Sequence, residues 1–405
     1  MFYDRPFDNL WENVRNNNLV LATFNNQNGN GGYLAPIPQA LARYANQPVE
    51  TDFPGLTMFQ QNWKTGYAMT DFLGVQRAVS ESWNIEIAGI GSLDRHLLTT
   101  DEINRPFSLA PSAAGPNNFN DSYNPNLPMI AYLGSQGASS YNALTAVARY
   151  RSNGRSLYAA YTWSHSIDNQ SDPLAGEFFD LNFASLTPST YAPSVGTFSK
   201  QFDSRSDKAS SDFDQRQSLV FYSIWPLPSA HGAMGLLRDW KISQMAAFRS
   251  GFPFTVYAPS TEPVSGGTIF NTRADLTGEA PTSIRKPVAG GFQVLDPSQF
   301  TAPPPGQLGS TGRNAFEGPG FFNVDVSLSR SFPIRVWSES GRLTLRADAF
   351  NVLNHANLGQ PDSQMTSPTF GEALYGRMGQ NSGFPSLVPL SETARQIQVL
   401  LRLEF

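Results

Sequence analysis

The sequence predicts an all-β fold, a transmembrane antiparallel up-and-down β-barrel with long external loops and short periplasmic turns. Its last strand gives the first indication, because Ile397, Val399, Leu401, Leu403 and Phe405 alternate with mostly polar neighbours and would share one face. The second is that such segments are joined by alternately short and long connections. The third is the absence of an apolar run of roughly 18 residues, which a membrane helix would need. A barrel lacks such runs, since only alternate residues face lipid.

Period-two segments recur along the chain and define the predicted strands. These cover residues 64–79, 82–91, 142–151, 156–166, 214–225, 238–250, 322–332, 341–352 and 394–405. In the clearest of them, Phe322 and Val324 fall on one face, and Asn323 and Asp325 fall on the other. A half-exposed soluble sheet has the same pattern, so no single strand decides the class.

The connections discriminate better than the strands. The link Ser152-Asn153-Gly154-Arg155 contains Asn-Gly, a strong signal for a tight hairpin. Residues 226–237 and 333–340 form further short links. The links between them are long, at residues 92–141, 167–213, 251–321 and 353–393. Structureless loops of that length are uncommon in compact soluble domains, whereas outer-membrane barrels combine long external loops with short periplasmic turns.

Strand directions predict an incomplete barrel, the C-terminal portion of a larger one. If Phe405 ends at the periplasmic rim, residues 1–63 form an external loop that follows a truncated strand, and residues 64–405 supply barrel strands with long external loops. Roughly nine strands result, where single-chain bacterial barrels have even numbers. The chain also starts without the apolar region of a signal peptide. The alternative is a complete protein with an irregular N-terminal region.

Composition argues against several classes of partner. The net charge of −5 lacks the excess of basic residues that nucleic-acid binding requires. The chain has no cysteine, so it has neither a disulfide framework nor a thiolate metal site. We therefore expect no nucleic-acid partner, no cofactor and no metal.

No enzyme motif stands out. His96, His165, His231 and His355 are scattered, without the spacing of a metal or catalytic motif, and we nominate no catalytic residue. The group around Asp214, with Asp212 and Arg216, is interpreted as a solvated cluster at a strand entry, not as an acid–base site.

The strand faces also predict roles for individual side chains. Arg346, Asp348, Arg402 and Glu404 are expected to face the lumen, where they would form cross-strand ion pairs or line a solute path. Aromatic residues near strand ends are expected to form interfacial girdles. These are Trp63, Trp83, Tyr141, Trp163, Trp225, Trp240, Phe321 and Phe332.

Several short motifs are spread over nearly the whole chain. They are Asn351-Val-Leu-Asn-His355, Ser367-Pro-Thr-Phe-Gly371, Ala394-Arg-Gln-Ile-Gln398, Tyr161-Thr-Trp-Ser-His-Ser-Ile-Asp168, Phe213-Asp-Gln-Arg-Gln217, Ser250-Gly-Phe-Pro-Phe254 and Phe2-Tyr-Asp-Arg5. Together they resemble the motifs of Oar-like TonB-dependent receptors, in the order expected for that family.

The resemblance implies a place in the cell outer membrane of a Gram-negative bacterium, in contact with its lipid. It also implies that Val399, Leu401, Leu403 and Phe405 form a C-terminal signature recognised by the barrel-assembly machinery. In that family a regulatory-like domain and a plug precede the barrel, so the TonB system would act only through N-terminal parts that this sequence lacks.

The resulting hypothesis is the C-terminal barrel portion of a TonB-dependent receptor that takes up a bulky, unidentified solute. Two alternatives remain from the residues alone. One is a passive porin or adhesin-type barrel, and the other is a secreted, soluble all-β binding domain.

Overall fold

A computed structural model describes the following parts of the chain: residues 2–3, 56–105, 124, 130–171, 198–227, 239–258, 272–278, 283–304, 307–336, 339–375 and 394–405. Within them, no helix is long and apolar enough to span a membrane. A 12-stranded sheet organises the described residues, and small sheets gather at one of its ends.

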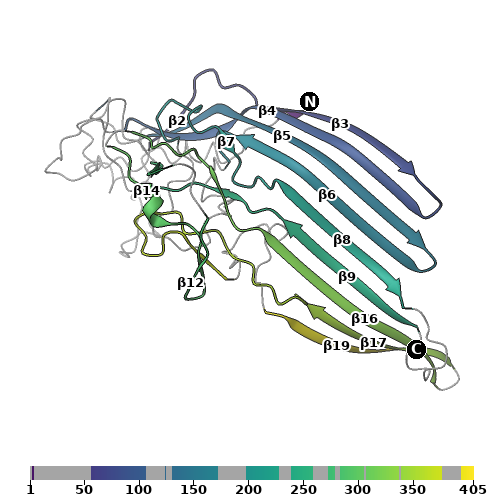
Figure 1. Cartoon of the computed structure of the whole chain (residues 1–405). Helices are drawn as coiled ribbons and strands as arrows, with labels where there is room; N and C mark the ends of the chain where they lie inside the picture. The colour runs from purple at the N-terminus through teal and green to yellow at the C-terminus, as the bar shows by residue number, and fades with distance from the viewer. Residues whose placement is uncertain are drawn as a thin grey trace, which may run out of the picture.

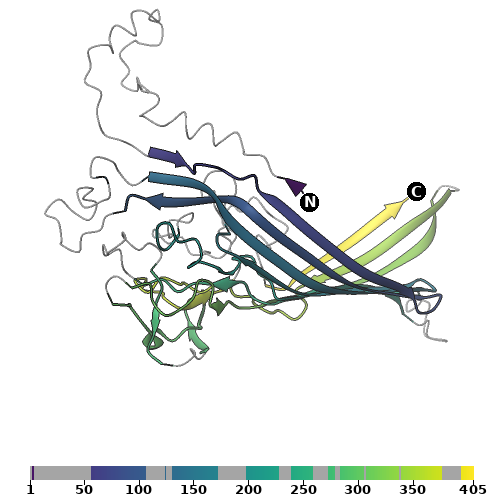
Figure 2. The same ribbon diagram turned by 90° about the horizontal axis from the view of Figure 1, so that it is seen from above.

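The large sheet follows chain order, as predicted for an up-and-down barrel. Its antiparallel path runs β1 (Phe2–Tyr3), β3 (Tyr67–Ala78), β4 (Trp83–Ile103), β5 (Ile130–Ser152), β6 (Arg155–Asp168), β8 (Gln217–Pro226), β9 (Trp240–Arg249), β16 (Phe321–Val336), β17 (Glu339–Phe350) and β19 (Gln396–Glu404). The sheet is open and bends into a trough, with β3 on one arm and β19 on the other (Figures 1 and 2). Each predicted strand is present.

The register aligns the apolar faces of neighbouring strands. Leu343 lies opposite Leu403, and Leu345 lies opposite Leu401, so their side chains share one face of β17 and β19. The same face continues across the sheet to Leu73, which is 78% exposed. We call it the apolar belt. Its exposed members include Leu73, Val75, Ile87, Leu144, Ile397, Val399, Leu401 and Leu403.

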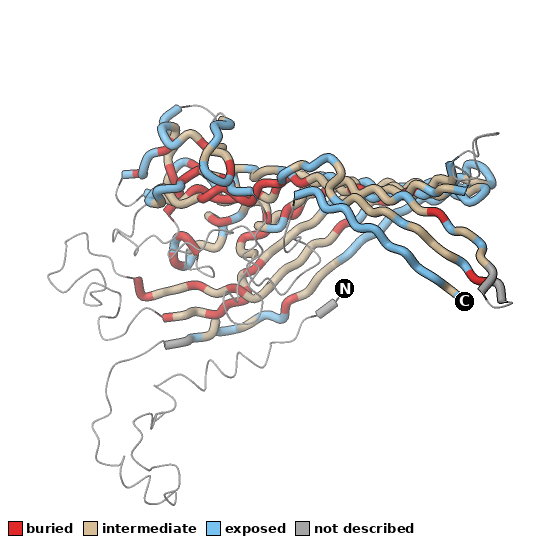
Figure 3. The backbone as a smooth tube through the Cα atoms, turned by 90° about the horizontal axis from the view of Figure 1, so that it is seen from below, coloured by how far each residue is buried: buried red, intermediate tan, exposed pale blue. Residues whose placement is uncertain are grey.

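The exposure of this belt decides between a membrane barrel and a soluble sheet. A soluble sheet would bury such a face against a second layer. Here the clustered apolar core lies elsewhere, in the loops, and Figure 3 shows buried residues concentrated at the loop end. In a transmembrane barrel the apolar belt meets lipid and the opposite, polar face lines the interior.

Aromatic side chains flank the belt near both of its ends. At one end, the Trp83 ring centroid lies 4.9 Å from that of Tyr150, which lies 6.0 Å from that of Trp225. Towards the other end, Phe248 stacks on Phe322 with centroids 6.0 Å apart. Such rings suit the two membrane interfaces.

Two of the predicted girdle residues belong to the other face. Tyr141 pairs directly with Ser92 and Ser166, and Phe321 pairs with Arg249, on the polar side of the sheet. Aromatic residues near strand ends occur on both faces, so position along the strand does not reveal the face.

The two ends of the sheet differ as the connections predicted. Figure 1 shows tight turns and the C-terminus at one end and the loops at the other. In the turn between β5 and β6, Asn153 has φ 48° and Gly154 has φ 76°. Two successive positive φ values match the two-residue hairpin that Asn-Gly favours.

Strands β4 and β5 are longer than predicted. The sequence placed their limits at residues 91 and 142, but the ladder continues to the pair Ile103 and Ile130, with register shifts on either side of Leu97. Thr99 and Asp101 in this extension are buried. Beyond the membrane both faces of a strand contact protein or water, so the period-two pattern ends although the strand does not.

The region predicted as the first external loop contains two short strands. β1 pairs antiparallel with β3, and β2 (Leu56–Phe59) pairs parallel with the extension of β5. Residues 4–55 lie outside the described residues.

The long loops carry their own small sheets and core. β7 (Ala209–Ser210) pairs antiparallel with the end of β6. β10 (Pro253–Phe254) pairs with β15 (Phe316–Glu317), and β11 (Asp275–Leu276) pairs with β14 (Phe300–Thr301). β13 (Gly291–Gln293) lies between β12 (Lys286–Val288) and β18 (Glu372–Leu374). A 3-10 turn, η4, covers Pro297–Gln299. The buried cluster comprises Phe254, Val256, Ala274, Leu295, Phe300 and Phe370. Loops after β9 and β17 thus pack together.

Candidate functional site: the polar wall and the loop assembly

The predicted lumen-facing residues form two ion pairs on the polar face. Arg346 Nε lies 2.7 Å from Asp348 Oδ1 in β17, and Arg402 Nη2 lies 2.9 Å from Glu404 Oε1 in β19. Both pairs join residues of the same strand. The expected cross-strand pairing is therefore wrong: Arg346 lies opposite Leu400, and Arg402 opposite Thr344. Residues two apart share a face, which brings their side chains within reach.

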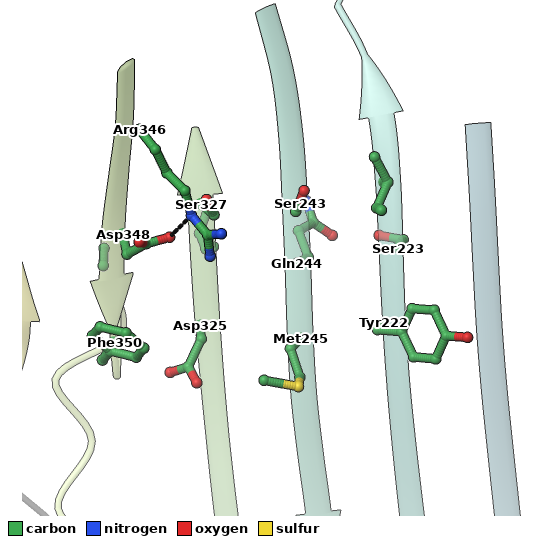
Figure 4. A pocket seen from close by; sticks show the side chains of 13 residues that line it. Tyr222, Ser223, Ser243, Gln244, Met245, Asp325, Ser327, Arg346, Asp348 and Phe350 are labelled. Atoms are coloured by element: carbon green, nitrogen blue, oxygen red, sulfur yellow. Dashed lines mark hydrogen bonds and ion pairs between the residues drawn. The ribbon is translucent and has the colours of Figure 1, made fainter. Parts of the chain in front are cut away.

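Arg346 and Asp348 line a pocket on this face. The pocket has a volume of about 230 Å³ and spans β8, β9, β16 and β17. Figure 4 shows Tyr222, Met245 and Asp325 side by side on neighbouring strands at one level of it. Its lining combines aromatic and thioether groups with carboxylates, hydroxyls and one guanidinium. This mixture of apolar surface and a few polar groups is typical of small-molecule sites.

The C-terminal signature residues lie at the sheet edge. Val399 and Leu401 pair with Ala347 and Leu345 on the apolar belt, and Phe405 follows the end of β19 at the turn end of the sheet. Val399 is 71% exposed and Phe405 is 85% exposed. The four side chains are therefore exposed at the edge of the sheet.

At the opposite end, the loops form what we call the loop assembly: residues 198–216, 251–258, 272–278, 283–304, 307–320 and 352–375. Arg105, which follows β4, is 0% exposed and holds this assembly to the sheet. Its Nη2 lies 2.8 Å from Asp101 Oδ1 and donates to the Phe198 carbonyl at 2.6 Å, while Nη1 donates to the Ser199 carbonyl at 2.9 Å. One buried cation thus joins the β4 extension to the loop after β6.

Arg273 makes a second link, between the loop after β9 and the loop after β6. Its Nη2 contacts Asp207 Oδ1 and donates to the Ser206 carbonyl at 3.1 Å. Asp207 also accepts hydrogen bonds from the Ser199 amide at 2.8 Å and the Ser199 hydroxyl at 2.7 Å. The carboxylate is therefore satisfied from two separate segments.

Arg313 makes the third link, between the loop after β9 and the end of β6. Its Nη2 lies 2.6 Å from Asp168 Oδ1 and 3.3 Å from Asp212 Oδ1, and its Nη1 donates to the Asp207 carbonyl at 2.8 Å. Asn314 adds a hydrogen bond from Nδ2 to Asp212 at 2.6 Å. Ion pairs shielded from solvent stabilise only when their other donors are also bonded. Here Nη1 and Nη2 of Arg313 each donate to more than one oxygen.

Burial and neighbouring carboxylates shift the pKa values of two groups in the loop assembly. Burial lowers the pKa of the Arg313 guanidinium, but Asp212 and Asp168 together outweigh it and hold the pKa above its ordinary value. Burial, with a smaller contribution from Asp212, raises the pKa of the Tyr257 hydroxyl to about 12. Both groups stay protonated at neutral pH.

The cluster expected to be solvated is so only in part: Asp212 and Arg216 are partly exposed, whereas Asp214 is buried. Asp214 is 3% exposed and accepts a hydrogen bond from the Ser166 amide at 2.8 Å. His165 Nε2 lies 3.6 Å from Asp214 Oδ2 and 3.2 Å from Ser210 Oγ. In a Ser-His-Asp triad the two partners contact opposite ring nitrogens, whereas here both contact Nε2. Within the described residues, no group of three potential ligands could hold a metal ion.

Sequence reasoning missed Arg105, Arg273 and Arg313. They lie in segments without period-two pattern, and the carboxylate partners of Arg273 and Arg313 lie far away in the sequence. Only the Asp101–Arg105 pair is local, and its spacing is that of any surface charge pair.

Comparison with solved structures finds two outer-membrane transporters that are similar to this chain. The chain is similar to the outer membrane transporter YddB from Escherichia coli, with 10% identity, a TM-score of 0.40 and coverage of 86% of this chain and 34% of that one. It is also similar to the FrpB iron transporter from Neisseria meningitidis (F3-3 variant), with 10% identity, a TM-score of 0.37 and coverage of 87% and 33%. The chain thus spans about a third of the length of each.

No curated protein sequence matches the chain. The family model described as outer membrane beta barrel domain matches residues 1–398, nearly the whole chain. The chain therefore belongs to the outer membrane beta barrel domain family.

Proposed function

We propose that this chain is the C-terminal barrel portion of a TonB-dependent, Oar-like outer-membrane receptor that takes up a bulky solute. The loop assembly would capture the solute outside, and the polar wall would line its path. Plug and energy coupling would come from N-terminal parts of the same protein.

The observation that carries the proposal is the fixed loop assembly at one end of an open barrel wall. Three arginines, of which Arg105 and Arg273 are buried and Arg313 is largely buried, hold loops from three connections in one arrangement. A site on ordered loops loses less conformational freedom when it binds a ligand. A passive pore needs no such ordering, so the assembly favours capture over simple diffusion.

The open sheet supports the barrel-portion part of the proposal. Among the described strands, β1 and β19 are the two edges of the sheet path. Unpaired backbone groups at an edge are not tolerated in lipid, so a membrane form needs further strands to close the wall. The ordered motifs, from Phe2-Tyr3 to Gln396, favour a TonB-dependent receptor as the source of these strands.

Uptake in the bacterium tests this function. The gene that encodes this chain and the gene for TonB are deleted separately, and compounds that remain in a complex medium are compared by mass spectrometry. We expect both deletions to leave the same bulky compound unconsumed. If only the deletion of this chain has that effect, the barrel is a passive porin and the proposal is wrong.

A further inference from the structure

A row of side chains crosses the polar wall from strand to strand. Arg149 lies opposite Tyr158, Tyr158 opposite Tyr222, Tyr222 opposite Met245, and Met245 opposite Asp325. Directly opposed residues share a face, so all five point to the polar side of the sheet. We call these five residues the wall track.

The wall track connects the two ends of the sheet. Arg149 lies near the end of β5 at the tight turn with β6, whereas Asp325 lies near the start of β16 at the loop end. Strands in a barrel tilt relative to its axis, so a row perpendicular to them climbs along the wall. A solute that follows this row would pass from the loop assembly towards the periplasmic turns.

Aromatic and apolar groups form the middle of the track. The Tyr158 and Tyr222 rings stack with centroids 5.2 Å apart and planes 15° apart, and the Arg149 guanidinium lies 5.6 Å from the Tyr158 centroid. Tyr222 is 47% exposed and Met245 is 56% exposed. Both side chains are therefore exposed on the polar face of the sheet.

The charges along the track are already compensated. Arg149 Nη1 lies 2.9 Å from Glu86 Oε2. In the pocket, Arg346 pairs with Asp348. Asp325 accepts hydrogen bonds from Asn323 Nδ2 at 2.9 Å and from the Asn351 amide at 2.8 Å. With two arginines against three carboxylates, the wall track and its pocket offer no excess positive charge to an anionic solute.

The exposed Tyr222 ring, extended by the partly buried Tyr158 ring and set beside carboxylates and hydroxyls, matches the chemistry of a neutral sugar chain. The C–H face of a pyranose packs on an aromatic ring, and its hydroxyls donate to carboxylate or serine oxygens such as those of Asp325 and Ser327. The pocket volume of about 230 Å³ lies below the 300–1,000 Å³ typical of whole-ligand sites. It suits one ring of a chain whose other rings lie along the track.

We propose that the wall track binds a neutral oligosaccharide, one sugar ring after another, inside the barrel. This inference rests on the proposed uptake function and names the class of solute.

Binding to the protein at its natural length in detergent micelles tests it by isothermal titration calorimetry. The probes are the neutral hexamers maltohexaose, cellohexaose, xylohexaose and chitohexaose, with anionic hexagalacturonate for comparison. We expect at least one neutral hexamer to bind and hexagalacturonate not to bind. Tyr222→Ala and Tyr158→Ala should each weaken the affinity about tenfold, whereas Tyr222→Phe should retain it.

Tyr161→Ala is the matched control, because Tyr161 lies on the same strand as Tyr158 but on the opposite face. It should leave the affinity unchanged. Folding of each variant is checked by heat-modifiable gel migration, and Met245→Ala replaces any tyrosine variant that does not fold.

Three results would overturn the inference: no neutral hexamer binds, hexagalacturonate binds more tightly than the neutral hexamers, or Tyr161→Ala loses as much affinity as the track variants. If sugars do not bind but uptake still requires TonB, only the wall track is refuted; sugar binding with TonB-independent uptake refutes the proposed function instead.

Discussion

Arg313 and Asp168 are 145 residues apart in the sequence, yet Arg313 Nη2 lies 2.6 Å from Asp168 Oδ1. Asp168 is the last residue of β6, and Arg313 belongs to the loop after β9. Their contact fixes a loop to the end of a barrel strand. It is a direct link between the wall and the loop assembly.

Removal of the Arg313 charge is expected to loosen the loop assembly. Arg313→Met leaves the buried Asp168 carboxylate without a cation, which should lower the local opening free energy by about 3–5 kcal/mol. Hydrogen exchange of amides in residues 198–216 measures this. The control is Arg346→Met, which breaks an exposed pair and should cost less than about 1 kcal/mol. Equal exchange in the two variants would contradict a stabilising role of the buried pair.

The loop assembly is also expected to lose stability in strong alkali. The pKa of Tyr257 is raised from 10.0 to about 12, so the folded state favours the neutral hydroxyl. This contribution is fully present below pH 10 and is lost as the pH rises through about 12. Tyr257→Phe should remove a tyrosinate absorbance step near pH 12. An unchanged titration curve would show that this hydroxyl is not shielded.

Two adjacent residues of β19 should differ in how strongly an introduced charge destabilises the protein. Leu401 lies on the apolar belt, whereas Leu400 lies opposite Arg346 on the polar wall. Leu401→Arg should lower the free energy of unfolding in lipid vesicles by about 2–4 kcal/mol, the cost of a cation on the lipid face near the bilayer midplane. Leu400→Arg should have a much smaller effect. Urea titration provides both values, and similar losses would contradict the assignment of faces.

The terminal phenylalanine is expected to affect assembly more than stability. Phe405→Ala, made in the protein at its natural length, should reduce the heat-modifiable fraction in the outer membrane, because the aromatic end of the last strand is predicted to be recognised by the assembly machinery. Leu400→Ala on the polar face is the control. A normal yield of folded Phe405→Ala would refute the signature.

The strands were predictable because lipid imposes a pattern on them. On the lipid side of β16 and β19 every second residue is apolar, as Val324 and Leu401 are, and this period is visible in the sequence. The extension of β4 to Ile103 was not predictable, because that pattern ends where the membrane ends.

The site was predictable only in part, for a related reason. Arg346 and Asp348 were placed on the polar face because their strand is periodic, whereas their pairing within one strand was missed. The contact of Arg313 with Asp168 joins distant loops, and nothing in either segment indicates the other. The wall track depends on register, which relates Tyr158 to Tyr222 only once the strands are paired.

Spin-label accessibility along β19 tests the alternation of faces most directly. This chain has 0 cysteines, so in the protein at its natural length, with any cysteine elsewhere replaced by serine, a single cysteine introduced at positions 397–403 carries the only label. In lipid vesicles, labels at 397, 399, 401 and 403 should contact oxygen dissolved in the bilayer, and labels at 398, 400 and 402 should contact a water-soluble nickel complex. Uniform accessibility along the strand, or water contact at residues 399 and 401, would contradict a wall with lipid on one side and an aqueous interior on the other.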